Sequence, residues 1–157
     1  MELLGTISSI IFGGILLYLL IREYLKVKKD QKIINSKLDN NTVQTADIRI
    51  GSMVAVNVAV NFGSEYDYCK FYFNAGEVFL KFRYSFPADC YTIPLVLKKN
   101  EHNYYSYFCS FTVTQFEPRE TEAKIHFKNK TFIGSAFTLY LKNISEEDLE
   151  LLKKNLS

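Results

Sequence analysis

The sequence predicts a mainly β (α+β) fold, in which a single N-terminal transmembrane helix is followed by an antiparallel β-barrel or sandwich of about seven strands that ends in a C-terminal helix. Three observations predict it. Residues 3–21 carry no charge, residues 43–141 alternate apolar and polar side chains over long stretches, and the last residues return to helical spacing. Aromatic residues make up 15% of the 157 residues, which is enough to fill the core of one compact domain after the helix.

Residues 1–21 are expected to form the transmembrane helix. The uncharged run would extend about 28 Å at roughly 1.5 Å per residue, close to the thickness of the hydrocarbon core of a bilayer. A cleaved signal peptide would need a basic stretch before the apolar run and a small-residue cleavage site after it. Here the segment begins with Met1-Glu2 and ends in Arg22-Glu23-Tyr24, so we expect a retained anchor.

The excess positive charge lies next to this helix. Residues 1–39 hold six basic and four acidic residues, which accounts for the net charge of +2 and leaves the rest of the chain neutral. Because lysine and arginine beside a transmembrane end stay in the cytoplasm, we expect a single-pass protein of the cell (inner) membrane, with its N-terminus outside and residues 43–157 in the cytoplasm. A neutral domain argues against nucleic-acid binding.

Residues 22–42 are expected to form a basic juxtamembrane helix and linker. Four bases could contact anionic lipid headgroups there: Arg22, Lys26, Lys28 and Lys29. The usual clustering of basic residues on the cytoplasmic side of a transmembrane helix explains the same charges without any lipid contact. Within the preceding helix, Gly5, Ser9 and Gly13 lie on one face, a small-residue pattern that permits a homodimer through the transmembrane helix, although glycine and serine are common in membrane helices.

The β-rich domain is expected over residues 43–157. Residues 54–62 alternate like a half-buried strand, and Gly51-Ser52 before them indicates either a tight turn or a bulge within one long strand, so both stay open. Residues 68–73 and 77–86 predict a hairpin, and further strands are expected at 91–97, 104–116, 123–127 and 132–141. Ser145, the acids after it and the leucine spacing predict a C-terminal helix over 145–156.

The second half of the chain carries a family resemblance. Ile93-Pro94-Leu95, a last strand at 137–141, and Lys142-Asn143-Ile144 leading into an acidic, leucine-rich helix resemble bacterial pleckstrin-homology-like (PH-like) domains, which are often attached to transmembrane helices. The resemblance covers residues 66–157 and implies seven antiparallel strands closed by one helix. The additional β sequence at 43–62 departs from the family pattern.

The sequence contains no recognised catalytic or metal-binding motif. Its two histidines, His102 and His126, have no nucleophile or carboxylate at a motif spacing, and there is no Gly-rich phosphate loop. We therefore expect neither an enzyme nor a cofactor. Cys69, Cys90 and Cys109 form no C-x-x-C pair, so buried free thiols are expected, while one disulfide with one free thiol stays open.

One candidate anion site lies on the first predicted hairpin. Lys70, Lys81 and Arg83 are similar to a basic pattern with which some PH domains hold phosphoinositide headgroups, and the resemblance would make them phosphate ligands. A solvated strand face explains the same residues more simply.

A second candidate anion site lies on a later strand. Lys124, His126 and Lys128 alternate and so share one face, where an anionic lipid or protein partner could bind. Glu120 and Glu122 are close in sequence and are expected to neutralise part of this charge.

Two functions from different classes fit these expectations. The first is a membrane-anchored interaction module that presents a PH-like domain at the cytoplasmic membrane face and binds a protein or lipid partner. The second is a membrane-anchored immunity or accessory protein that binds one cognate protein, such as a toxin.

Overall fold

The structure, a computed structural model, describes residues 2–38, 42–56, 66–74, 76–84, 89–92, 94–98, 105, 109–129 and 136–156, apart from the side chains of residues 2–10, 55 and 56. Two helices flank the β domain, α1 (Glu2–Lys37) and α2 (Glu146–Leu156). The strands in chain order are β1 (Val43–Gln44), β2 (Ile48–Val56), β3 (Tyr68–Asn74), β4 (Glu77–Tyr84), β5 (Cys90–Tyr91), β6 (Leu95–Lys98), β7 (Ser110–Pro118), β8 (Ala123–Lys128) and β9 (Ala136–Lys142).

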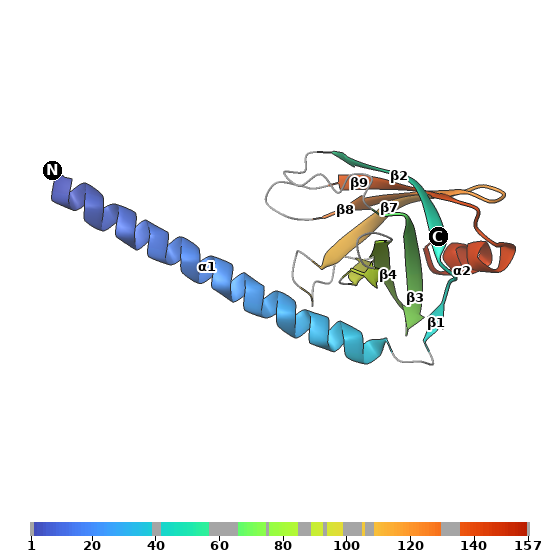
Figure 1. Cartoon of the computed structure of the whole chain (residues 1–157), viewed down its shortest axis with the longest axis horizontal. Helices are drawn as coiled ribbons and strands as arrows, with labels where there is room; N and C mark the ends of the chain where they lie inside the picture. The colour runs from blue at the N-terminus through green and yellow to red at the C-terminus, as the bar shows by residue number, and fades with distance from the viewer. Residues whose placement is uncertain are drawn as a thin grey trace.

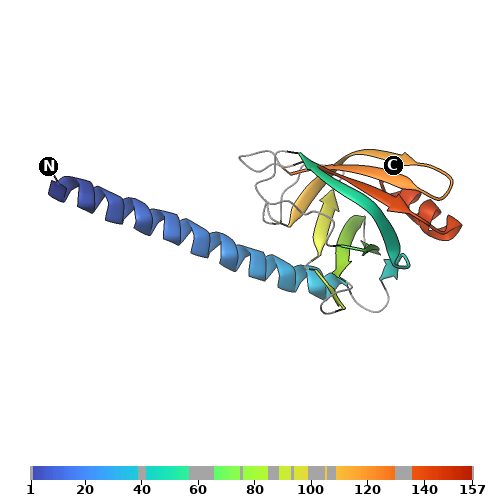
Figure 2. The same ribbon diagram turned by 45° about the horizontal axis from the view of Figure 1, so that its top comes forward.

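Seven strands form a closed barrel in the order β3-β2-β9-β8-β7-β6-β4, and the pairing of β3 with β4 closes it (Figures 1 and 2). The short strands β1 and β5 extend it by pairing with β3 and β4. The predicted mainly β fold with a helix at each end is confirmed. The prediction of a wholly antiparallel sheet is wrong for one pair, because β6 and β7 are parallel.

The core lies inside the barrel and continues under α2. Alternation along the β3–β4 hairpin buries Cys69, Phe71 and Leu80 completely, while Lys70 and Lys81 face outward. Ile125, Leu139 and Leu152 are also fully buried, and Leu152 connects α2 to the barrel interior. Burying this apolar surface supplies most of the favourable free energy of folding.

The open question about Gly51 has a clear answer. β2 is one strand, and its register against β9 shifts between Ile50 and Ser52, so Gly51 occupies a bulge. A Cβ atom on Gly51 would lie 2.7 Å from Cε of Lys142, so a larger residue there would displace the flexible lysine side chain. Residues 57–62 of the predicted strand are outside the described part of the chain.

Three other predicted strands have different bounds. The strand expected at 91–97 is divided into β5 and β6, with Pro94 between them, because proline cannot donate a ladder hydrogen bond. β7 begins at Ser110 and extends to Pro118, later than the expected 104–116. β9 begins at Ala136, and residues 132–135 of its predicted range are outside the described residues.

α2 begins as its sequence predicts. The Oγ atom of Ser145 accepts a hydrogen bond from the backbone N–H of Asp148, 3.1 Å away, as an N-cap does. The Asp148 carboxylate accepts the backbone N–H of Ala46 at 3.2 Å, which connects the first turn of α2 to the segment before β2. Asn143, with φ of 55°, lies in the left-handed region that asparagine tolerates and leads from β9 towards the helix.

α1 is one continuous helix from Glu2 to Lys37. Its C-terminal end lies against the barrel, and its N-terminal part projects away from it (Figures 1 and 2). Within the part of the chain that the structure describes, no helix is sufficiently long and apolar to cross a membrane.

Candidate functional site

The C-terminal part of α1 packs on the outer face of β4 and β6. Ile34 has an exposed fraction of 0% and lies in a cluster with Phe79, Val96, Tyr105 and Cys109. Phe79 and Val96 are opposite each other on neighbouring strands and point away from the barrel core. Alternation gives these strands a second apolar face, and α1 covers it.

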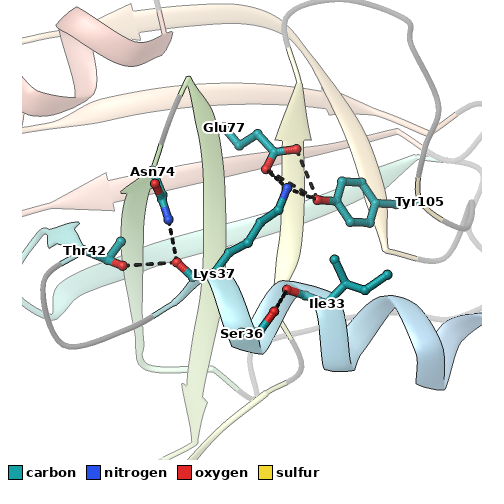
Figure 3. A network of polar contacts seen from close by, with 7 residues as sticks. All are labelled: Ile33, Ser36, Lys37, Thr42, Asn74, Glu77 and Tyr105. Atoms are coloured by element: carbon teal, nitrogen blue, oxygen red, sulfur yellow. Dashed lines mark hydrogen bonds and ion pairs between the residues drawn. The ribbon is translucent and has the colours of Figure 1, made fainter.

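A polar network fixes the end of α1 (Figure 3). The Lys37 ammonium donates to Oε2 of Glu77 at 2.5 Å and to the Tyr105 hydroxyl at 2.8 Å, and the hydroxyl donates to Oε1 of Glu77 at 3.2 Å. The hydrogen bond to Glu77 raises the pKa of Lys37. Burial is the main cause that raises the pKa of the Tyr105 hydroxyl, which keeps it protonated as a donor.

The last carbonyl of α1 has two side-chain donors. The amide Nδ2 of Asn74 donates to the Lys37 carbonyl oxygen at 2.6 Å, and the Thr42 hydroxyl donates to the same oxygen at 3.2 Å (Figure 3). A helix leaves its final carbonyls without partners, so these bonds complete the C-terminus of α1. The β3–β4 turn therefore holds the helix end through Asn74 and Glu77.

A cavity of about 500 Å³ lies at one end of the barrel interior, where α1 borders it. α1 contributes Val27 and Gln31, and the barrel contributes mostly apolar residues. Among the described residues, six aromatic rings line it: Tyr66, Phe82, Tyr84, Tyr91, Phe111 and Phe137. Its volume is in the range of about 300–1,000 Å³ that is typical of ligand sites.

The rings around the cavity hold one another in place. Tyr66 stacks on Phe82 with ring centroids 4.9 Å apart, and the Tyr84 hydroxyl donates to the Tyr66 hydroxyl at 2.9 Å. Phe111 and Phe137 meet edge to face at 5.1 Å. Aromatic pairs of these geometries are favourable, so these contacts hold the walls of the cavity in place.

The structure brings the two lysines of the first candidate anion site together. Lys70 and Lys81 are directly opposite on β3 and β4, and both ammonium groups lie over the ring of Tyr72, at 6.0 and 5.2 Å from its centroid. Burial lowers the pKa of Lys81. Among the described residues neither lysine has an ion pair, and their binding of an anion stays a prediction.

Arg83, the third predicted ligand, is already paired. Its guanidinium donates to both carboxylate oxygens of Asp89 at 2.6 Å and to Oδ2 of Asp47 at 2.6 Å. The hydrogen bonds to Arg83 lower the pKa of Asp89. Asp47 also accepts the Tyr91 hydroxyl at 2.6 Å, so Arg83 connects β4 to β5 and to the residues before β2.

The second candidate anion site is partly neutralised. Lys124 lies 3.6 Å from Oε1 of Glu117, its cross-strand partner, and Nε2 of His126 lies 3.8 Å from the same oxygen. Thus Glu117 on β7 supplies the acid, where Glu120 and Glu122 were expected, because cross-strand pairing brings it closer than sequence distance suggests. Lys128 is exposed at the end of β8.

The predicted membrane contacts lie along α1. Arg22 pairs with Glu23 at 3.2 Å, and the Lys28 ammonium lies 5.1 Å from the ring centroid of Tyr24. Lys26 and Lys29 are exposed. A Cβ atom added to Gly13 would meet nothing within 4 Å. The side chains at positions 5 and 9 lie outside the described residues, so the dimer stays a prediction.

The cysteines are all free, which answers the question of a disulfide. Cys69 and Cys109 are buried, as expected, and Cys90 is exposed. Burial raises the pKa of the Cys69 thiol far above its usual range, so it behaves as an apolar core residue. His102 is outside the described residues. No group of three or more possible metal ligands occurs among the residues that are described.

The sequence did carry a signal for the missed contact between α1 and the barrel. Val27, Gln31, Ile34 and Leu38 recur at intervals of about one helical turn, which predicts one helix face that packs on something. No comparable signal exists for the cavity, because its rings come together only when the barrel closes. Comparison with family models, with curated proteins and with solved structures finds nothing that matches this chain.

Proposed function

We propose that this chain is a single-pass, membrane-anchored binding module that holds a β-barrel at the cytoplasmic face of the cell membrane, where the barrel binds a protein or lipid partner. One observation carries the proposal. Each large apolar side chain of α1 from Ile11 to Ile21 is exposed, with fractions between 41% and 69%. A soluble monomer rarely leaves so continuous an apolar surface uncovered, whereas the hydrocarbon of a bilayer would cover it on all sides.

The contact between α1 and the barrel supports a positioning role. α1 continues without a break from the uncharged run to Lys37, and Ile34 and Lys37 dock its end on the barrel. A barrel that is docked on its own anchor is held near the membrane surface. The basic residues after Ile21 support the cytoplasmic orientation.

The PH-like relationship is part of the same proposal. Seven strands that follow one another around a barrel, with a C-terminal helix packed on its core, support it. The parallel pairing of β6 and β7 departs from an antiparallel PH-like barrel.

The exposed Cys90 provides a test of both anchoring and orientation. Cells that produce the full chain are treated with a membrane-impermeant maleimide before or after permeabilisation, and the membrane fraction is assayed for label. We expect the chain in the membrane fraction, with label only after permeabilisation. Because Cys69 and Cys109 are buried, the label should lie on Cys90. Cys90→Ser is the control and should lose the label. Recovery of the chain in the soluble fraction would refute the anchor, and label on intact cells would refute the orientation.

A further inference from the structure

We infer that the cavity at the end of the barrel interior beside α1 takes the hydrocarbon chain of a membrane lipid, an inference that rests on the proposed membrane anchor. The cavity has the matching chemistry. Its lining is mainly aromatic and aliphatic, with Gln31 and Thr92 among its few polar side chains. Thr92 already accepts the backbone N–H of Phe82 at 3.0 Å, so an apolar ligand loses few hydrogen bonds on entry.

The cavity lies on the side of the barrel that would face the membrane. Its lining includes Tyr84 at the end of β4, Leu95 at the start of β6 and Phe111 near the start of β7. α2 follows the end of β9 and covers the opposite end of the barrel, far from the N-terminal end of α1 (Figures 1 and 2). The barrel end that contains the cavity therefore points along α1 towards the uncharged run.

The distance along α1 is short enough for an acyl chain. Val27 is six residues beyond Ile21, which corresponds to about 9 Å of helix at roughly 1.5 Å per residue. The headgroup layer on each side of a bilayer is about 5–8 Å thick, so Val27 lies at its outer boundary. An acyl chain that follows α1 out of the hydrocarbon would reach the cavity just beyond the headgroup layer.

The basic residues along this stretch favour an anionic lipid. Arg22, Lys26, Lys28 and Lys29 all lie between the uncharged run and Gln31. They can hold a negative headgroup at the surface while its chain extends towards the cavity. We therefore assign the site to an acyl chain of an anionic phospholipid.

The test uses the full chain in phosphatidylcholine vesicles that contain a minor fraction of phosphatidylglycerol with a photoreactive group in one acyl chain. After illumination, adducts are mapped by mass spectrometry. We expect adducts on α1 between residues 11 and 21 and also on Tyr91, Leu95 or Phe111. Gln31→Trp, which fills the cavity from the helix, should lower the barrel adducts about tenfold, the effect of a loss of about 1.4 kcal/mol. Lys32→Trp, one residue further along α1 and exposed, is the matched control and should change neither set.

The outcomes separate the two proposals. Adducts on α1 alone would overturn the lipid site and leave the anchor intact, and adducts on neither part would overturn both. Barrel adducts that persist in Gln31→Trp would show that the lipid lies outside the cavity, which also overturns the inference. Protection of Cys109 from thiol reagents checks that α1 is still docked in the variant. If that protection is lost, Leu95→Trp fills the cavity from the barrel side, with the same decrease expected.

Discussion

Replacing Ile34 by alanine should release α1 from the barrel without unfolding the barrel. Ile34 is completely buried against Phe79, Val96, Tyr105 and Cys109. The change removes about three buried carbons, worth roughly 0.8 kcal/mol each, and leaves a cavity, so the cost to docking is about 2.4–4 kcal/mol. Each 1.36 kcal/mol changes the ratio of undocked to docked protein tenfold. This ratio should therefore rise about 60-fold to 900-fold, until docking is lost altogether.

Cys109 reports this release directly. It is 2% exposed in the cluster that α1 covers, whereas Cys69 is in the barrel core and 0% exposed. In a Cys90→Ser background, the rate at which a thiol reagent labels Cys109 should increase by the factor above in Ile34→Ala, and the rate at Cys69 should not change. Mass spectrometry of the labelled peptides separates the two sites.

A neighbouring residue gives the matched control. Ile33 is 39% exposed and points away from the cluster, so Ile33→Ala should leave Cys109 labelling at the wild-type rate. A wild-type rate in Ile34→Ala would show that α1 does not protect Cys109. An equal rise at Cys69 and Cys109 would show that the barrel itself unfolds, and either result refutes the docking described above.

Three further predictions concern polar contacts. A double-mutant cycle of Lys37→Met and Glu77→Gln, with Cys109 labelling as the measure of docking, should give a coupling energy between the two side chains of roughly 0.2–1 kcal/mol, since both are partly exposed. A coupling energy of zero would contradict the network. The hydrogen bonds from Arg83 lower the pKa of Asp89, so the stability that the ionised Asp89 contributes is present above the unfolded pKa of about 3.9 and is lost as the pH falls through the lower folded pKa. In thermal melting, Asp89→Asn should lack this loss of stability at acid pH. Matching pH curves for wild type and Asp89→Asn would rule out the contribution. Ser145→Ala should cost about 0.5–2 kcal/mol in unfolding experiments and Ser145→Asp much less, whereas equal losses would argue against the N-cap.

Local pattern was sufficient for the elements whose structure depends on neighbours in sequence. The β3–β4 hairpin follows from alternation on both sides of the turn at Gly76, and α2 follows from Ser145 and the leucine spacing. The same pattern left the state of Gly51 open, because a bulge is defined by the register of β2 against β9, far along the chain. Pairing between distant strands is not encoded in the period of either strand.

The prediction for Arg83 shows why an outward strand position does not guarantee a free charge. Alternation places Lys81 and Arg83 on one face, and both positions do face outward. The carboxylates of Asp47 and Asp89 come from segments that reach Arg83 only after the barrel closes. A basic pattern in sequence therefore indicates where charges lie, while the fold decides which remain available for an anion.

The two parts of α1 present their apolar surfaces differently. From Ile11 to Ile21 the large apolar side chains are exposed and point in all directions around the helix. Beyond Arg22 the buried and half-buried positions lie on one side, with Ile34 at the contact, while Lys29 and Lys32 on other sides are exposed. The change of pattern therefore reflects the contact that the C-terminal part of α1 makes with the barrel.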